Sequence, residues 1–494
     1  MSNPVTRRRF LRQLNCAAVG SSAILNTLLN LKLANSVAAQ GGPLDNKALV
    51  CLFLSGGCDS FNVLVPWEQT RYNTYSITRG PFGSDGGLAL DRNALRQLAA
   101  PANDFGLHPS CQNLQAMANG TDAGNPRGAF AGKRRLAFVS NVGTLVQPIT
   151  KAQFNAWENG QNAALPVPKA LFSHSDQIEQ WQTAVPQGMA QLSGWAGRCA
   201  DILSSYYNTG TNSMSISLGG NNVFQVGNST QQFVITPSGA LSFEGDTGGS
   251  TGNPLQLRNA TLRSTLDQHY TNLLTESFSR LTKQSDDAQL NFQTQFDSAS
   301  AQLGATVDAL FPGNNYLATT LKAVVKTIKI RSLLGLRRQT FFVQYGGWDH
   351  HGELLNTQAG MLSTLDTAIG AYQQALELLG LQNDVVTFTA SDFSRTLRSN
   401  GRGTDHAWGA NAMVFGGKVD GGKIFGTFPD LTLDGPDDVG RGGRCLPSTA
   451  ADKYFAELLR WFGVSSGNMS YVLPNVANFW NPTSPTGPLG FFLP

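Results

Sequence analysis

The chain has 494 residues, of which 41% are hydrophobic and 14% charged, with 53 glycines. This composition excludes a disordered chain and indicates a loop-rich globular protein of one large domain or two ordinary ones. The formal charge of +3 is due to five basic residues among the first 39, where no Asp or Glu stands; the remaining chain carries −2, which argues against nucleic acid as a partner.

The N-terminus has the features of a twin-arginine export signal. Arg7, Arg8 and Arg9 precede Phe10 and Leu11, a weakly apolar stretch follows, and small residues stand at 37–39 before Gln40. We therefore predict that residues 1–39 are a cleaved signal peptide. The expected partner in export is the twin-arginine translocase, and the expected location is periplasmic or secreted. No later stretch approaches the ~20 apolar residues of a spanning helix, so we expect no stable membrane anchor.

Short, continuously apolar runs predict strands that are buried on both faces of a sheet. They lie at residues 48–54, 136–139, 340–345, 385–389 and 412–415. Helical spacing predicts a helix over Met361–Leu379, and a last helix capped by Ser448 and closed by Gly463. Strands that alternate with helices indicate an α/β fold with a doubly wound, mostly parallel sheet flanked by helices.

The middle of the chain has a different pattern. Residues 215–243 alternate apolar and polar side chains between turn signals, which predicts β-hairpins, and 246–253 is a Gly/Ser/Thr-rich linker. Residues 255–310 are polar and helical. We interpret residues 40–494 as a single domain in which 200–312 form an insertion or lid. Five cysteines follow residue 40, an odd number, so at least one thiol is free or pairs between chains.

Acidic residues follow three of the apolar strands. The first strand ends in Gly-Gly-Cys-Asp with Asp59, the second in Gly-Gly-Trp-Asp with Asp349, and the third in Ala-Ser-Asp with Asp392. Because parallel strands bind ligands at their carboxyl ends, these acids converge if the strands are neighbours. Carboxylates that lie close together favour a bound cation.

Two histidines extend this set to a mixed oxygen and nitrogen ligand group. His351 follows Asp349 by two residues, and His406 stands in Gly-Thr-Asp-His. Such a set suits a divalent metal, namely Zn, Mn, Fe, Ca or Mg. In the alternative interpretation these residues cap helices or order loops. In an extended segment His350 points away from His351, and we therefore rank it lower.

Taken together, these motifs resemble the DUF1501 family of twin-arginine-exported bacterial proteins. The resemblance covers nearly all of the chain after residue 40. It includes Leu-His-Pro at 107–109, Ser-His-Ser at 173–175 and Gly-Trp-Ala-Gly-Arg at 194–198. The family is grouped with the alkaline phosphatase and sulfatase superfamily, and its activity is not established. The resemblance implies an alkaline phosphatase-like fold and a site for one or two metal ions, or none.

The resemblance also implies roles for individual residues. Asp59, Asp349, His351, Asp392 and His406 are the implied metal ligands. Phe393 stands where the superfamily has a second histidine, which puts a second ion in doubt.

For the nucleophile, Ser173 and Ser175 open a predicted helix, whose N-terminus suits an anion, and Ser60 is the competitor. A plain helix cap is the alternative for either serine. Arg395 is the candidate clamp for a tetrahedral anion, or a partner of Asp392. His108 and His269 are expected to be structural and surface residues.

Three functions are consistent with these residues. The first is an exported metal-dependent hydrolase of phosphate or sulfate esters that acts on a small anionic ester or glycan. The second is a non-catalytic periplasmic protein that binds a partner or a glycan with a degenerate site on the same fold. The third is a serine hydrolase with a Ser-His-Asp triad.

Overall fold

The computed structural model describes residues 43–122, 129–188, 192–243 and 254–494. The twin-arginine motif, the signal peptide at 1–39 and the linker at 246–253 lie outside these ranges and remain predictions. Within the described ranges, no helix combines the length and the apolar character needed to cross a membrane.

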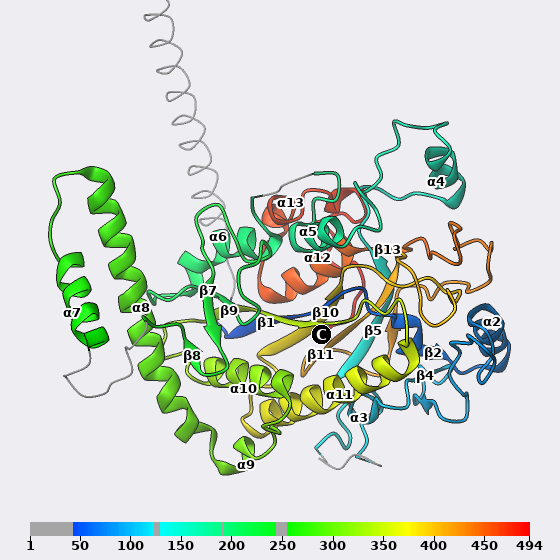
Figure 1. Ribbon diagram of the computed structural model, residues 1–494, viewed down its shortest axis with the longest axis horizontal. Coiled ribbons are helices and arrows are strands. Elements are labelled where there is room, and N and C mark those ends of the chain that lie inside the picture. Colours follow the sequence, from blue (N-terminus) through cyan, green and yellow to red (C-terminus); the bar gives the residue numbers. More distant parts are fainter. Residues whose placement is uncertain (1–42, 123–128, 189–191, 244–253) are drawn as a thin grey trace, which may run out of the picture.

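A ten-stranded sheet runs through the centre of the molecule (Figure 1). Its order is β12-β5-β11-β10-β1-β9-β6-β7-β8, and β13 pairs with β5. The strands are β1 (Lys47–Ser55), β5 (Leu136–Gly143), β6 (Ser215–Ser217), β7 (Phe233–Thr236), β8 (Gly239–Ala240), β9 (Arg338–Gly346), β10 (Val385–Ser391), β11 (Ala410–Gly416), β12 (Ile424–Phe425) and β13 (Thr449–Ala450). All five strands predicted from apolar runs are present.

The register of the central strands brings their carboxyl ends together. β1 is parallel to both neighbours, with Ser55 opposite Gly346 of β9 and Leu54 opposite Ser391 of β10. Since all three strands end at the same level, the residues that come after them share one edge of the sheet. The predicted mostly parallel sheet is confirmed, with two exceptions: β11 runs antiparallel to both β10 and β5, and β8 runs antiparallel to β7.

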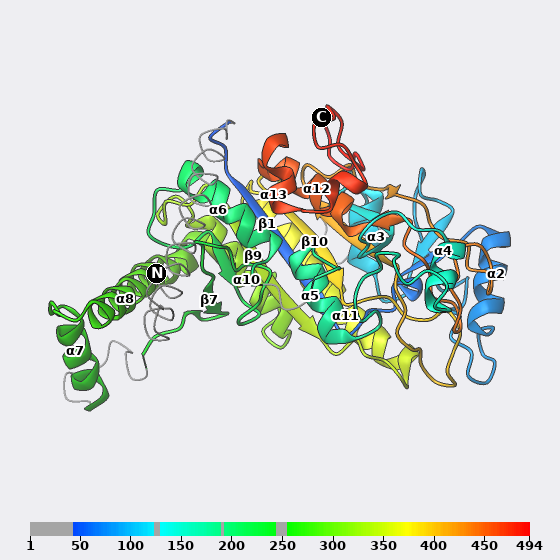
Figure 2. The same ribbon diagram turned by 90° about the horizontal axis from the view of Figure 1, so that it is seen from above.

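Helices cover both faces of the sheet, and each face has its own apolar core (Figures 1 and 2). Successive residues of β1 alternate between the cores: Val50 and Leu52 pack with α3, α10 and α11, whereas Cys51 and Phe53 pack with α6 and α12. This alternation is why β1 is continuously apolar. The helices named so far are α3 (Gln112–Asn119), α6 (Trp195–Tyr207), α10 (Tyr316–Lys329), α11 (Leu354–Leu378) and α12 (Ala451–Phe462).

A smaller three-stranded sheet lies beyond the carboxyl end of β1. Its order is β2-β4-β3, and all its pairs are antiparallel. It is formed by β2 (Leu64–Pro66), β3 (Arg96–Gln97) and β4 (Phe105–Leu107), and α2 (Gln69–Arg79) follows β2 directly. The short 3-10 helix η1 (Ser60–Asn62) connects β1 to this unit.

Two predicted helix boundaries are wrong. α11 begins at Leu354, seven residues before the predicted start, because the polar Gln358 occupies a buried position in its first turns and so interrupts the apolar period. α12 begins after Ala450 rather than at Ser448, whose hydroxyl donates to the carbonyl of Thr427 instead of capping the helix. The predicted end at Gly463 is confirmed by a left-handed residue with φ 113°.

The middle segment divides between the body and a projection. α6 is almost entirely buried and β6 pairs in parallel with β9, so both belong to the body. One antiparallel hairpin, β7–β8, replaces the several predicted ones. Only α7 (Pro254–Leu266) and the first part of α8 (Leu273–Leu303) project, at the end of the molecule opposite α2 (Figure 1). Residues 200–312 therefore do not form one lid.

Candidate metal centre

The ends of β1 and β9 form two Gly-Gly turns that touch one another. A side chain at Gly56, which has φ +117°, would place its Cβ 2.7 Å from the backbone nitrogen of Asp349. The buried guanidinium of Arg395 donates to the carbonyls of Gly56, Gly57 and Trp348. It also donates to Asp349 Oδ1 at 2.5 Å, and so it fixes that carboxylate at the sheet edge.

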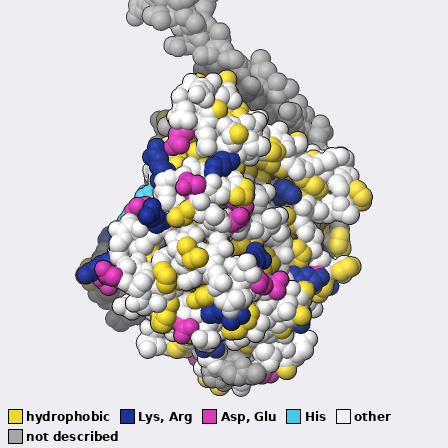
Figure 3. Space-filling model, turned by 90° about the vertical axis from the view of Figure 1, so that its right-hand side faces the viewer, with side chains coloured by type: hydrophobic (Ala, Val, Ile, Leu, Met, Phe, Trp, Pro, Cys, Tyr) yellow, Lys and Arg dark blue, Asp and Glu magenta, His cyan; other side chains and the backbone are white. Residues whose placement is uncertain are grey.

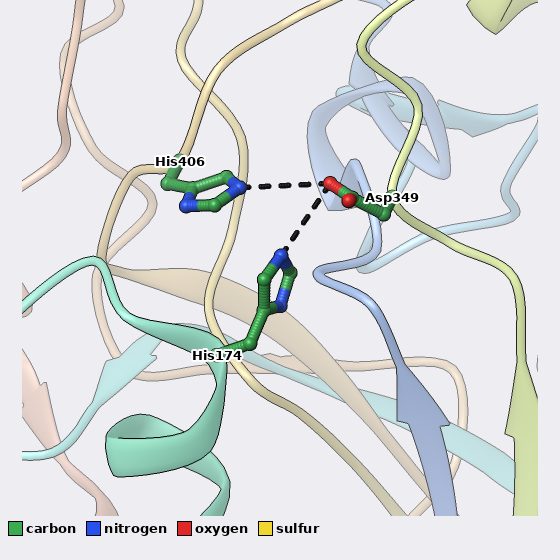
Figure 4. A group of neighbouring side chains, drawn as sticks. All are labelled: His174, Asp349 and His406. Carbon is green, nitrogen blue, oxygen red and sulfur yellow. Dashed lines mark ion pairs between the residues drawn. The ribbon is translucent and has the colours of Figure 1, made fainter.

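Three histidines surround this carboxylate, and Figure 4 shows two of them, His174 and His406. Asp349 Oδ1 lies 3.0 Å from His351 Nε2 and 3.5 Å from the Nε2 atoms of both His174 and His406. His174, Asp349 and His406 each offer a ligand atom within 4.8 Å of the others. His351 lies beside this group, with its Nε2 3.0 Å from His406 Nε2.

The other ring nitrogen of each histidine is held by an oxygen acceptor. Asp392 Oδ2 lies 2.6 Å from the Nδ1 of His174, and Asp405 Oδ1 lies 3.2 Å from that of His351. The Nδ1 of His406 lies 2.7 Å from the carbonyl oxygen of Phe172. A carbonyl or carboxylate oxygen accepts the proton, so Nδ1 carries it and the Nε2 lone pair of each neutral ring faces the centre.

With both rings neutral and protonated on Nδ1, the Nε2 atoms of His351 and His406 would face each other across 3.0 Å as two acceptors, which a cation between them would relieve. His174 Nε2 is buried without a hydrogen-bond partner. Metal bonds of ~2.0–2.1 Å in a tetrahedral site place neighbouring ligand atoms roughly 3.3 Å apart. The observed separations of 3.0 and 3.5 Å around Asp349 Oδ1 bracket that value. By their mutual distances His174, Asp349 and His406 could hold one divalent metal, and His351 lies close enough to Asp349 and His406 to be a further ligand.

The pKa shifts agree with a cation site. Burial raises the pKa of Asp349, but the hydrogen bond and charge of Arg395 and the nearby histidines outweigh it and hold the pKa below its usual value. Burial lowers the pKa of His406, which favours the neutral imidazole that a metal requires. Burial also raises the pKa of Asp392, against the hydrogen bond with His174.

The backbone before α5 (His174–Thr183) orients two of these groups. Phe172 has φ +72°, a conformation that non-glycine residues rarely adopt, and its carbonyl accepts from His406. Its ring lies 3.7 Å below the guanidinium of Arg444, which donates to the carbonyl of His406. The strained residue therefore links α5 to the loop that carries His406.

The structure brings together three of the five predicted metal ligands, namely Asp349, His351 and His406. The prediction for Asp59 is wrong, because this carboxylate is fully buried and forms an ion pair of 2.5 Å with Arg79. The prediction that Asp392 is a ligand is also wrong: the residue acts one step away, through Nδ1 of His174.

The predicted anion clamp is wrong as well. Arg395 is 0% exposed, and its donors are taken by backbone carbonyls and by Asp349 rather than by Asp392. The hydroxyl of Ser173 donates to Asp176 Oδ2 at 2.5 Å. The hydroxyl of Ser175 lies 3.2 Å from the hydroxyl of Ser173. A nucleophilic role for either serine stays a prediction, and Ser60 is buried beneath the site.

Sequence reasoning missed His174 as a ligand. The Ser-His-Ser motif at 173–175 contains this histidine, but the motif follows no apolar strand, and so only its two serines were predicted to be functional. The remaining histidines behave as expected: His108 is buried, with Nδ1 accepting from the backbone of Ser110, and the side chain of His269 is 90% exposed. His350 is buried, whereas the side chain of His351 is 47% exposed.

Neither a second metal nor a catalytic triad is supported among the described residues. Asp59 is turned to Arg79, and the Phe393 ring packs 4.7 Å from that of His174 and 4.5 Å from that of His406. No other group of potential metal ligands occurs in the described part of the chain. The hydrogen bonds of the three site histidines go to Asp392, Asp405, Phe172 and one another, and none goes to a serine.

Fold and site together define a mixed α/β protein with a candidate metal centre at the carboxyl edge of a mostly parallel sheet. The chain belongs to the DUF1501 family, described as "Protein of unknown function (DUF1501)", whose sequence model matches residues 46–439. No curated protein matches the sequence.

Solved structures show only a distant likeness. Ps i-CgsB in complex with k-i-k-neocarrahexaose is 10% identical over 89% of this chain and 77% of that chain, with a TM-score of 0.29. Ps i-CgsB without that ligand is 11% identical over the same shares, again with a TM-score of 0.29. Likeness at this level says nothing about the ligands of this chain.

Proposed function

We propose that this protein is an exported, metal-dependent hydrolase of phosphate or sulfate esters with a single divalent ion. The observation that carries the proposal is the convergence of three Nε2 lone pairs on Asp349 Oδ1 at 3.0–3.5 Å. Three neutral imidazoles and one carboxylate favour Zn²⁺, Mn²⁺ or Fe²⁺ over Ca²⁺ and Mg²⁺, which prefer oxygen ligands. The export that residues 1–39 predict belongs to the same proposal.

The residues of the site have distinct tasks. When bound, the ion supplies a Lewis acid that polarises an ester oxygen and acidifies water. His174, His351, His406 and Asp349 would hold it. Asp392 and Asp405 keep the Nδ1 protons of their histidines in place, and Arg395 holds the Asp349 carboxylate without reaching the substrate.

The surroundings suit a polar substrate. The side chains of Asp349 and His351 are each 47% exposed, so the site opens to solvent. A pocket of about 520 Å³ is lined by Glu353, which stands two residues after His351 in the chain. Its lining also includes Asp85, Arg402 and three glycines. Polar side chains and exposed backbone suit a hydroxyl-rich or charged ligand better than an apolar one. We therefore expect the substrate to be a small anionic ester or a glycan ester.

The test is turnover of aryl phosphates and aryl sulfates by protein loaded with Zn²⁺ or Mn²⁺. We expect hydrolysis of one of the two substrate classes, and its loss to background in Asp349→Ala and His406→Ala. The matched control is Asp366→Asn in α11, a buried carboxylate that accepts hydrogen bonds from the backbone of Asn113 and Leu114 and not from a site residue. Metal-loaded protein without turnover on either class would contradict the hydrolase proposal.

A non-catalytic binding protein on the same fold is the second candidate. Two observations favour it: Arg395 is buried, so no arginine predicted to grip an anion reaches the site, and the Ser173 hydroxyl is committed to Asp176. If this candidate is correct, the protein binds a metal and an anionic glycan but does not hydrolyse the glycan. Binding of anionic glycans that depends on the metal, measured by calorimetry in the absence of hydrolysis, would support it.

A further inference from the structure

The 31-residue helix α8 carries one continuous apolar face. Because 18 residues make five full helical turns, residue pairs with that spacing lie in line along the helix. Leu274 is thus in line with Phe292, Phe278 with Phe296, and Leu281 with Ala299.

The two halves of this face have opposite surroundings. In the second half, Phe292, Phe296 and Ala299 are 0–1% exposed, because α10 and β7 of the body cover them. In the first half, Leu274, Phe278 and Leu281 are 81%, 70% and 64% exposed. We call these three residues the α8 overhang. Figures 1 and 2 both show this part of α8, with α7, extending beyond the sheet.

The overhang is apolar on one side and charged on the other. Glu276, Arg280 and Lys283 lie on the opposite side of the helix by the 100° spacing of residues. They form pairs within the hairpin, with Arg280 bound to Glu276 and Lys283 to Asp267. The positions that flank the apolar residues are uncharged: Thr275, Ser277, Thr282 and Gln284.

The opposite end of the molecule shows no such stripe on the face that Figure 3 presents. On the end of the molecule that carries α2, apolar side chains are interspersed with charged and polar ones, and histidine reaches the surface at one margin (Figure 3). A contiguous exposed apolar stripe such as the overhang marks an interaction site.

We propose that the α8 overhang binds the α8 overhang of a second copy of this chain across a two-fold axis. In an antiparallel pairing centred near Phe278, this residue meets its own copy, and Leu274 of one chain meets Leu281 of the other. A symmetric pairing usually risks contact between like charges, but here the flanking positions are uncharged. The same face therefore meets the body in its second half and the partner copy in its first.

An anionic membrane is a poorer occupant. Helices that lie on such surfaces carry Lys and Arg beside the apolar face. Within 254–303 the four basic residues are outnumbered by five acidic ones, and those nearest the overhang are paired.

The test is the mass of the full chain in solution, measured by light scattering at micromolar concentration. We expect wild type to have twice the mass of the chain and Phe278→Asp to have the single mass, with Leu281→Asp behaving in the same way. Ile77→Asp is the matched control, because this exposed apolar residue of α2 lies at the other end of the molecule; it should remain dimeric. A monomeric wild type, or a dimer that survives Phe278→Asp, would overturn the proposal.

Cysteine cross-linking tests the predicted register. In a Cys16→Ser background the five remaining cysteines are buried. Phe278→Cys should give a disulfide-linked dimer under mild oxidation, whereas Lys283→Cys, on the opposite side of α8, should not. Equal cross-linking of the two variants would contradict the antiparallel pairing.

Discussion

Two adjacent strands are followed by the same motif, but the aspartates that end the two motifs lie in opposite surroundings. β1 ends in Gly-Gly-Cys-Asp and β9 in Gly-Gly-Trp-Asp, and the two strands are parallel and in register. Asp349 is half exposed at the centre of three histidines, whereas Asp59 is fully buried against Arg79. The motif sets where the chain turns at the sheet edge, but the next segment sets which way the acid points.

The physical reason lies in the segment that comes after each strand. After Asp59 the chain enters η1, which is buried, and α2 brings Arg79 beneath it. After Asp349 the chain passes directly to His351, close to the surface, and Arg395 reaches across to hold the carboxylate. One acid therefore stabilises the fold, and the other is available to a ligand.

The largest expected effect is on stability, from Asp59→Ala. This change leaves the Arg79 guanidinium fully buried without its counter-charge, which costs about 3–5 kcal/mol of unfolding free energy. Asp349→Ala in metal-free protein should cost less than Asp59→Ala, because the buried Arg395 guanidinium keeps its hydrogen bonds to the carbonyls of Gly56, Gly57 and Thr404, whereas two of the Arg79 nitrogens have no other partner. Denaturant unfolding of both variants gives the comparison.

A double variant separates the charge effect from general disruption. Asp59→Asn with Arg79→Met removes both charges and should recover much of the lost stability, since an apolar replacement of a buried pair is often neutral. If Asp59→Ala were as stable as wild type and bound less metal, the contrast between the two strand ends would be wrong.

The next effect is on metal affinity, from Asp392→Asn. Loss of the carboxylate that holds His174 Nδ1 should weaken metal binding about 10–100-fold, as is typical for groups that orient a ligand. Asp405→Asn should weaken it less, because its contact with His351 is longer, at 3.2 Å, and exposed. Competition with a chromophoric chelator measures both affinities, and equal affinities for the two variants and wild type would contradict these roles.

A third acid, Asp452 of α12, is buried like Asp59 but has no ion pair with a described residue. Burial raises its pKa from 3.8 to about 8. The folded state thus keeps a proton that the unfolded state loses above pH ~4, so this contribution to stability is lost as pH rises toward about 8.

Asp452→Asn should remove this pH dependence. Relative to wild type, the variant should gain about 1 kcal/mol for each pH unit between pH 4 and pH 8, since it has no proton to lose. Unfolding at the two pH values provides the measurement. Parallel curves for the two proteins would show that Asp452 titrates normally.

Strand positions were predictable from the sequence because burial on both faces leaves continuous apolar runs. The position of Asp349 followed from the rule that parallel strands end at one edge, and His406 was indicated by the resemblance to the family. The direction of Asp59 was not predictable, because it depends on α2, an element whose polar sequence gives no sign that Arg79 is buried.

His174 was hidden for a related reason. It comes from the start of α5, 218 residues away from Asp392, and reaches the site only because α5 packs beside β10. No periodicity within a single segment encodes that contact. The projection of α7 and α8 away from the site was likewise missed, because a polar helical pattern does not say which edge of a sheet it leaves.

The central claim is that one ion is bound and that His174 is one of its ligands. Elemental analysis of the purified protein after exposure to Zn²⁺, Mn²⁺ and Fe²⁺, beside His174→Ala and His108→Ala, tests it most directly. We expect one equivalent of a transition metal in wild type and in His108→Ala, and loss of that metal in His174→Ala. Two equivalents in wild type, none at all, or full retention in His174→Ala would contradict it.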